Sequence, residues 1–298
     1  MNKLKIGYFA DGPWSHEAFE KIVADQTLQI LFIIPRFDSI DTKLEELASI
    51  HGIDFIKSSN INKKDFIESL QKYDCDIFVS LSFNQIFKNE IINLPPLKTI
   101  NVHCGKLPFY RGRNILNWAL INDENEFGIT VHYVDEGIDT GDIISQKVYP
   151  INDLDTYNSL LIKAYAGCAE ILYDTLKVIQ TGSFKSISQK SIHPIGFYCG
   201  IRREGDEKIN WNQTSRQIFN FIRAVSYPGP RATTFFNGEV VKINASKMIQ
   251  NAPSYIGTPG QIIGRNDTGH FIIKTLDSFI EIFDIETNCK LKIGINLV

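Results

Sequence analysis

Two polar residues that could take part in proton transfer, Asn101 and His103, stand two positions apart at the end of the apolar run Lys98–His103. Side chains two apart on a strand share one face, and ligands of open α/β sheets bind at the carboxyl ends of the strands. The Gly-rich segment Glu136–Asp142 carries Asp139, 38 residues after Asn101. If this segment folds back over the strand end, an amide donor, a titratable ring and a carboxylate meet. Those groups suit acyl transfer through a tetrahedral intermediate.

Other interpretations of these residues remain open at this level. An isolated Asn or His at a strand end is more often a structural hydrogen-bonding group, and a Gly-rich segment is most often a turn. Cys104 is rejected as a nucleophile, because adjacent strand residues point to opposite faces. His132, which alternates with apolar neighbours, is interpreted as a structural or supporting residue. The histidines are too dispersed for a metal site. The sequence has no G-x-G-x-x-G motif, which disfavours a nicotinamide dehydrogenase.

The elements that must position these residues alternate along the first half of the chain. Apolar runs predict strands at Leu4–Ala10, Gln29–Pro35, Asp76–Ser82 and Lys98–His103, with helices between them. This rhythm predicts an α/β fold with a Rossmann-like, mostly parallel sheet. Gly128–Val134 alternates as an edge or antiparallel strand does, and Ile143–Val148 is expected to pair with it. A long helix is predicted from about Thr156 to Gln180.

The sequence pattern changes after about Ser183, where short β-like runs are separated by turn residues. Asn237-Gly238 between two such runs predicts a hairpin. The part of the chain after about Ser183 is therefore predicted to form a smaller, mostly β domain, and a small barrel is the expected form. We expect a catalytic domain over residues 1–185 and a β-rich domain over 186–298. No role is assigned to residues 246–298.

Composition limits the partners of the 298-residue chain. Its net charge is −3 and its pI about 6.1, which gives no electrostatic footprint for a long nucleic acid. Five cysteines without a C-x-x-C pair indicate a reducing, cytoplasmic setting. The chain contains no signal-like start and no apolar run of about 18 residues, so we expect no membrane partner.

The motif N-x-H-x-x-x-L-P-x-Y-R-G at Asn101–Gly112, followed by D-x-G-x-D-x-G-D at Asp135–Asp142, resembles the folate-dependent formyltransferases. This family includes methionyl-tRNA, glycinamide ribonucleotide and sugar-nucleotide N-formyltransferases. Family-like residues continue from Arg203 to Pro228, so the resemblance covers most of residues 1–240.

The resemblance implies a Rossmann-like formyltransferase domain that uses N10-formyltetrahydrofolate as co-substrate and no metal. It places the catalytic trio on Asn101, His103 and Asp139. It also places the pterin pocket on two loops, Ser82–Ile86 and Ile138–Asp142. A flat ring with an amide-like edge suits such loops when apolar side chains flank it. The implied folate-binding residues are Phe83, Asn84, Ile86, Phe109, Ile138 and Asp142. For Phe83 and Ile86, plain core packing is the alternative.

Three features narrow the choice of the amine that is formylated. A second domain disfavours a glycinamide ribonucleotide enzyme, and the net charge disfavours tRNA. Where the family usually has Ser-Leu-Leu-Pro, this chain has Gly105-Lys106-Leu107-Pro108, which resembles the branch acting on nucleotide-linked 4-amino-4,6-dideoxy sugars. The first choice of substrate is therefore dTDP-4-amino-4,6-dideoxyglucose, for O-antigen and lipopolysaccharide synthesis.

Several residues are candidate contacts to that sugar nucleotide. Basic side chains suit a pyrophosphate, a helix start suits a phosphate or sugar, and an exposed tyrosine could stack on the base. The candidates are Trp14, Ser15, Lys106, Arg113, Asn114, Arg223 and Tyr227. The alternatives are a helix cap for Ser15, turn packing for Tyr227 and solvated surface charge for the basic residues. We also expect a homodimer through the β-rich region. The competing functions are a methionyl-tRNA formyltransferase-like enzyme and a non-catalytic folate- or nucleotide-binding relative.

Overall fold

The computed structural model describes residues 3–39 and 41–298, and their contacts form two compact units. The first unit contains the described residues up to 113, with 127–149 and 162–199. The second contains residues 114–126, 150–161 and 200–298. Each unit is therefore assembled from separate stretches of chain, and each is described by itself below. The domain boundary expected near residue 185 stays a prediction.

A seven-stranded sheet forms the centre of the first unit, in the order β3-β2-β1-β4-β5-β7-β8. The strands on its parallel side are β1 (Leu4–Ala10), β2 (Leu28–Ile34), β3 (Asp54–Phe55), β4 (Ile77–Leu81) and β5 (Thr99–His103). β7 (Glu126–Tyr133) runs antiparallel to β5, and β8 (Ile143–Pro150) lies beside it. This arrangement confirms the predicted Rossmann-like, mostly parallel sheet with an antiparallel strand next to the candidate residues.

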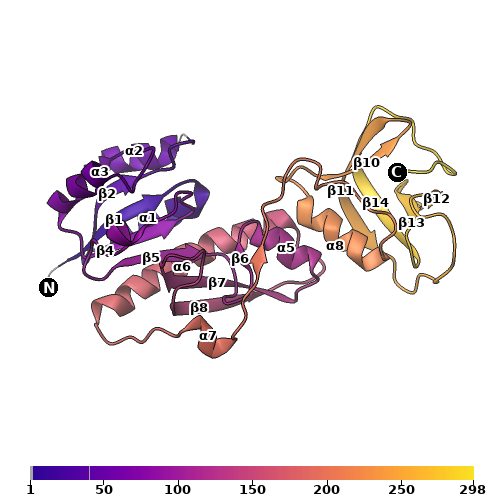
Figure 1. The fold of residues 1–298 in the computed structure, drawn as a ribbon. Coiled ribbons are helices and arrows are strands. Elements are labelled where there is room, and N and C mark those ends of the chain that lie inside the picture. Colours follow the sequence, from indigo (N-terminus) through magenta and orange to yellow (C-terminus); the bar gives the residue numbers. More distant parts are fainter. Residues whose placement is uncertain (1–2, 40) are drawn as a thin grey trace. The chain divides into compact units, whose positions relative to one another are not determined.

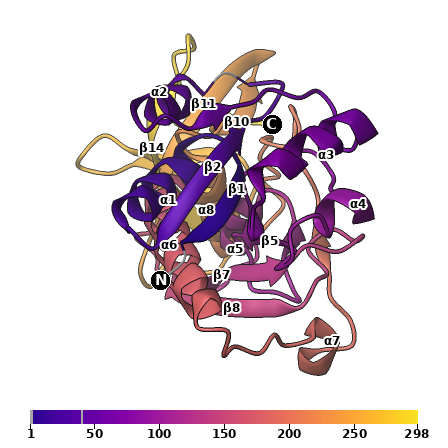
Figure 2. The ribbon, with the colours of Figure 1, turned by 90° about the vertical axis from the view of Figure 1, so that its left-hand side faces the viewer.

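Helices cover both faces of this sheet (Figure 1; Figure 2). Both faces need a cover because adjacent strand residues point to opposite faces and both can be apolar, as Tyr8 and Phe9 are. The Tyr8 hydroxyl donates to the Ser15 carbonyl in helix α1, whereas Phe9 packs into an apolar cluster with Ile67 of α3 and Ile91 of α4. The helices are α1 (Pro13–Ala24), α2 (Thr42–Ile50), α3 (Lys64–Leu70), η1 (Gln71–Tyr73), α4 (Asn89–Ile92), α6 (Tyr157–Gln180) and α7 (Gln189–Ile192).

A two-stranded parallel pair completes the first unit. β6 (Arg111–Gly112) pairs with β9 (Tyr198–Cys199), which places a late segment of the chain against the loop that follows β5. Strands this short were not predicted, because two residues carry no readable period. Across residues 3–39 and 41–298, no helix combines the length and apolar character needed to cross a membrane.

The second unit is built on a five-stranded antiparallel sheet in the order β10-β11-β14-β13-β12. Its strands are β10 (Ala232–Phe236), β11 (Glu239–Met248), β12 (Ile262–Arg265), β13 (Phe271–Lys274) and β14 (Phe279–Glu286). Asn237 and Gly238 join β10 to β11 with φ angles of 51° and 82°. Two successive positive φ values are those of a type I′ hairpin turn, so the hairpin prediction is confirmed.

Residues 294–298 join the two edge strands of this sheet. The Ile262 amide in β12 donates to the Ile295 carbonyl, at an N···O distance of 2.8 Å. Phe235 in β10 exchanges two backbone hydrogen bonds with Val298, at 2.8 and 2.9 Å. Backbone pairing therefore continues from one edge to the other, as expected for a small barrel. Residues 246–298, which had no assigned role, supply three strands and this closing segment.

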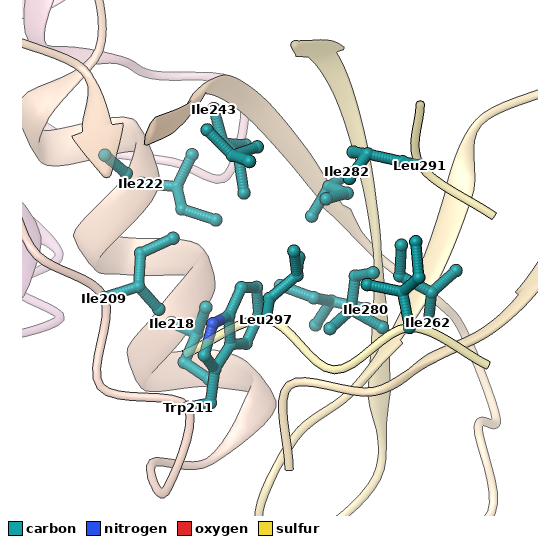
Figure 3. Close-up of a cluster of buried hydrophobic side chains, with 14 of the residues drawn as sticks. Ile209, Trp211, Ile218, Ile222, Ile243, Ile262, Ile280, Ile282, Leu291 and Leu297 are labelled. Atoms are coloured by element: carbon teal, nitrogen blue, oxygen red, sulfur yellow. The ribbon is translucent and has the colours of Figure 1, made fainter. Parts of the chain in front are cut away.

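The core of the second unit lies between this sheet and helix α8 (Ser215–Val225). Thr214 begins the helix with a capping box to Gln217, which satisfies backbone donors that a helix start leaves open. Ile218 and Ile222 point from α8 toward the strand side chains (Figure 3). Helix α5 (Ile115–Ile121) packs on α8, where the Asn117 side chain donates to the Ala224 carbonyl at 2.6 Å.

Candidate active site

The register of two neighbouring strands brings the predicted residues together. In the β5–β7 pair, Asn101 lies opposite His132 and His103 lies opposite Thr130. The Asn101 Nδ2 atom is 3.2 Å from His132 Nε2. Asp139, on the loop after β7, lies within 3.5 Å of both histidine rings. The expected meeting of Asn101, His103 and the Asp139 loop therefore occurs, inside the first unit alone.

The protonation of His103 follows from its two neighbours. Its side chain is only 8% exposed, and its Nε2 atom lies 2.7 Å from the Tyr110 carbonyl oxygen. A carbonyl only accepts, so Nε2 carries a proton in either charge state of the ring. The Nδ1 atom faces Asp139, at 3.5 Å from Oδ2. The basic nitrogen of the neutral ring is therefore the one beside the carboxylate.

The Asp139 carboxylate lies between two imidazole rings and a backbone amide. Its Oδ2 atom accepts from the Gly112 amide at 2.9 Å, and Oδ1 lies 3.5 Å from His132 Nε2. Asp139 itself has φ of +53°, a left-handed conformation that few non-glycine residues adopt. The Gly-rich segment was interpreted as either a turn or a catalytic loop. It bends so that Asp139 lies beside both histidine rings.

These surroundings shift two pKa values. Burial disfavours the charged form of Asp139, but His103, His132 and the Gly112 amide outweigh burial and lower the pKa of Asp139 to about 2. Burial also lowers the pKa of His103 below its ordinary value, against the opposing effect of Asp139. At neutral pH the pair is therefore a carboxylate beside a neutral ring that can accept a proton.

His132 is a residue whose part the sequence reasoning understated. Its Nδ1 atom lies 2.7 Å from the Tyr133 carbonyl, so Nδ1 donates there and Nε2 is left to accept from the Asn101 amide. The ring thus contacts two of the three predicted catalytic residues. The signal was present in the alternation of β7, which places His132 directly across from Asn101, on the same face of the sheet, once the antiparallel register is known.

Gly105 leaves the room that the His103 ring needs. A Cβ atom at this position would lie 2.4 Å from His103 Nε2 and 2.4 Å from the Tyr110 carbonyl oxygen. Cys104, its neighbour, is not placed for nucleophilic chemistry. Its contact with Cys168 and its burial raise the pKa of the Cys104 thiol well above the ordinary value, which keeps it protonated.

The loop after β4 holds three of the implied folate-binding residues. Phe83 packs on Phe9 and Phe87, with ring centroids 5.6 and 5.7 Å apart, so it lies against the core but stays partly exposed. Ile86 is 62% exposed. The Asn84 side-chain amide donates to Asp38 at 2.9 Å, and its Oδ1 atom is buried without a hydrogen-bond partner.

The other implied folate-binding residues lie on the neighbouring loops. Ile138 is 53% exposed, and Asp142 has an exposed side chain while its carbonyl accepts from Tyr133. Phe109 lies in an aromatic group with His193 and Phe197, at centroid distances of 5.2 and 5.6 Å. Two exposed isoleucines on separate loops offer apolar surface to a flat ring.

Four candidate substrate contacts belong to the first unit. Ser15 requires a correction: it is fully buried, and its hydroxyl donates to the Gly12 carbonyl at 2.8 Å, so it serves the start of α1 and offers nothing to a substrate. Trp14 packs edge-to-face on Tyr165. Lys106 and Arg113 have exposed side chains.

The remaining three candidates belong to the second unit. Arg223 also requires a correction, because its side chain is 4% exposed and donates to Asn220 and to the Asn152 and Asp155 carbonyls. A guanidinium bound in this way braces helix α8 and does not face a phosphate. Asn114 accepts from the Arg202 amide. Tyr227 is 62% exposed.

No cluster of three or more His, Cys, Asp or Glu side chains suited to a metal ion occurs within residues 3–39 and 41–298. The acid–base groups of the site are instead one carboxylate and two rings.

Comparison with known proteins gives two family matches that follow the two halves of the chain. The family described as "Formyl transferase" matches residues 23–173, and "Formyl transferase, C-terminal domain" matches residues 202–297. A methionyl-tRNA formyltransferase of Pelotomaculum thermopropionicum is 33% identical over 225 residues, 75% of this chain and 70% of that protein. The corresponding protein of Fusobacterium nucleatum is 28% identical over 304 residues, 99% of this chain and 96% of that protein.

Solved structures give a second set of similarities. WlaRD, described as a sugar 3N-formyl transferase and solved in the presence of dTDP and 5-N-formyl-THF, superposes with a TM-score of 0.70 and 26% identity. The match covers 98% of this chain and all of WlaRD. An N-formyltransferase of Helicobacter canadensis, in complex with folinic acid and dTDP-3-aminofucose, has a TM-score of 0.68 at 24% identity over 96% of this chain and all of that one. At that identity it supports the fold alone.

Proposed function

Because the chain belongs to the formyl transferase family, we propose that it moves the formyl group of N10-formyltetrahydrofolate to the amine of a nucleotide-linked amino-dideoxy sugar. The observation that carries the chemical part of this proposal is the buried pair of His103 and Asp139, 3.5 Å apart, beside Asn101. A donor, a base and a carboxylate in one site are what amine acylation requires.

The roles of the three residues follow from their neighbours. The neutral amine attacks the formyl carbon, and the Asn101 side-chain amide is the donor available to the negative charge that develops on the formyl oxygen. His103 keeps its Nε2–H on the Tyr110 carbonyl. The proton released by the amine is taken up at the His103–Asp139 pair, directly or through water. Nδ1 is its basic nitrogen, and Asp139 stabilises the imidazolium that results. The tetrahedral intermediate then collapses: the bond between the formyl carbon and N10 breaks, and the proton held at Nδ1 passes to N10 of the departing tetrahydrofolate, directly or through water.

The proposed folate contacts are the loops around Ile86 and Ile138, where both isoleucine side chains are exposed. A hydrogen bond between Asn89 and Glu136 connects the segments that follow β4 and β7. Phe109, Asn84 and Asp142 remain proposed contacts, whereas Phe83 supports the loop from the core. WlaRD, at 26% identity, was solved with a formyl-folate, and this supports the proposal.

The proposed acceptor is a dTDP-linked sugar, with dTDP-4-amino-4,6-dideoxyglucose as first choice. Two observations support it: the full-length similarity to WlaRD and a net charge of −3. Exposed Lys106 and Arg113 are the proposed pyrophosphate contacts, and Trp14, Asn114 and Tyr227 the proposed sugar and base contacts. Homodimer formation, a cytoplasmic location and a role in O-antigen synthesis stay predictions.

A methionyl-tRNA formyltransferase is the second candidate, favoured by the sequence relatives at 28 and 33% identity. The two candidates differ in how they depend on salt. A tRNA enzyme neutralises many phosphates, so its binding weakens steeply as salt rises, whereas a sugar nucleotide carries one pyrophosphate.

One mass-spectrometric assay tests both candidates. The protein is mixed with N10-formyltetrahydrofolate and a panel of nucleotide-linked 3-amino and 4-amino sugars, with charged initiator tRNA in parallel. A sugar that gains one carbonyl supports the proposal. Formylated tRNA with no sugar product overturns the acceptor, and no product at all favours a non-catalytic relative. His103→Ala and Asp139→Asn should lose turnover, whereas His51→Ala, exposed on the surface, should keep it; near-normal rates in either of the first two would refute the catalytic assignment.

A further inference from the structure

Gln189 of helix α7 is a buried polar residue that the catalytic roles above do not use. Its side chain is 2% exposed. The Nε2 atom donates to the Asp139 carbonyl at 2.9 Å and to the Gly141 carbonyl at 2.8 Å. The Oε1 atom accepts from Arg111 Nε at 3.1 Å and Nη2 at 2.6 Å. Every polar atom of this amide is therefore engaged inside the first unit.

The orientation of the amide is determined by what surrounds it. Nε2 faces two carbonyl oxygens, which only accept, and Oε1 faces a guanidinium, which only donates. If the amide were flipped, its oxygen would face the two carbonyl oxygens and its NH₂ group would face the Arg111 guanidinium. A glutamate at this position could keep Arg111 but would have no hydrogen for the Asp139 and Gly141 carbonyls.

Arg111 connects this amide to both catalytic side chains. It stands between Tyr110, whose carbonyl accepts from His103 Nε2, and Gly112, whose amide donates to Asp139 Oδ2. The Arg111 amide in turn donates to the Phe197 carbonyl at 3.1 Å. The segment that orients His103 and the loop that carries Asp139 thus meet at one side chain, Gln189.

Asp139 needs such an anchor more than an ordinary loop residue does. Its left-handed φ of +53° is disfavoured for a side chain with a Cβ atom, and such conformations persist where surrounding contacts over-determine them. The bond from Gln189 reaches the carbonyl of this same residue. Without it, the loop can relax toward a commoner conformation and carry the carboxylate away from His103.

We propose that Gln189 is a positioning residue for formyl transfer, which holds the Asp139 loop against the Arg111 segment and thereby sets the separation of Asp139 and His103. The proposal rests on the proposed function, in which those two residues form the proton-accepting pair. Gln189 touches no reacting atom in this account and acts only through Arg111 and the loop.

The test compares Gln189→Leu and Gln189→Glu with the matched control Gln180→Leu. Gln180 also donates its side-chain amide to a loop carbonyl, that of Thr27, at 2.8 Å, and this bond involves neither the Asp139 loop nor the Arg111 segment. For each protein, kcat and KM for the formyl donor are measured over a range of pH. Exchange of the Gly112 amide hydrogen is followed by NMR, because this amide binds the Asp139 carboxylate.

In Gln189→Leu, kcat should fall by about a hundredfold, the effect of misplacing a catalytic group by about 1 Å. The KM for the formyl donor should rise as well, because the same loop carries the proposed folate contacts Ile138 and Asp142. The pH profile of kcat should shift, and Gly112 should exchange faster. Gln189→Glu should keep the contact with Arg111 but, without a hydrogen for the Asp139 and Gly141 carbonyls, should show the same changes. Gln180→Leu should leave kcat, its pH profile and Gly112 exchange unchanged.

Three results would overturn the proposal: wild-type Gly112 exchange in both Gln189 variants, a wild-type kcat and pH profile in a folded variant, or an equal loss in Gln180→Leu. The exchange measurement needs no acceptor substrate. If the wild-type protein formylates nothing, the proposed function fails, and Gly112 exchange still decides whether Gln189 holds the loop.

Discussion

Replacing Gly105 by alanine tests whether the His103–Tyr110 hydrogen bond sets the geometry of the site. The added Cβ would lie 2.4 Å from both His103 Nε2 and the Tyr110 carbonyl oxygen, where ordinary contact begins at 3.4 Å. One of these neighbours is a backbone atom, so the overlap cannot be relieved by a side-chain rotation alone. The ring, the carbonyl or the Gly105 backbone has to move by about 1 Å.

The size of the effect follows from this movement. The Nε2···O distance is 2.7 Å, and an increase of about 1 Å takes it beyond hydrogen-bonding range. The ring then loses the acceptor that fixes its protonated nitrogen. A displacement of about 1 Å at a reacting group lowers the rate by about a hundredfold, or about 2.7 kcal/mol in activation free energy. Loss of the buried hydrogen bond should lower stability by about 1–3 kcal/mol.

Steady-state kcat for formyl transfer, with urea unfolding in parallel, measures both quantities. Gly264→Ala is the matched control, because its Cβ would meet only Ile272, at an ordinary 3.9 Å. The control should keep kcat. A Gly105→Ala protein that is folded and has a kcat within threefold of the wild type would refute the claim that this bond positions His103.

Three further predictions concern charge and packing. Since the folded pKa of Asp139 is about 2, below the ordinary 3.8, its stabilisation is present above pH 4 and lost on acidification; at pH 3 the loss of unfolding free energy in urea should be about 1 kcal/mol larger for the wild type than for Asp139→Asn. Ile222→Ala, in the barrel core, should cost about 2–5 kcal/mol in the same assay, and a smaller loss would mean that the core collapses to fill the space. Arg113→Met should raise KM for the sugar nucleotide, whereas Arg223→Met should lower the melting temperature and leave that KM unchanged; the opposite pattern would return Arg223 to the substrate site.

The periodic elements and the shared face of Asn101 and His103 could be predicted because their signals are local. The run at Leu4–Ala10 became β1 with the same bounds, and the helix predicted from about Thr156 to Gln180 became α6. Asn101 and His103 share a face because the strand period is two, and Asn237-Gly238 turns because both residues tolerate positive φ. In each case the decisive interaction lies within a few residues of the signal.

The tertiary structure decided what depends on distant partners. Arg223 and Ser15 are polar residues of ordinary appearance, and only packing shows that both are buried and bonded within the protein. His132 joins the site through a cross-strand register. Gln189 binds the Asp139 carbonyl across 50 positions of sequence, and no sequence motif indicates this contact. Composition and period describe neighbours along the chain, whereas hydrogen-bond partners of buried groups are chosen by the fold as a whole.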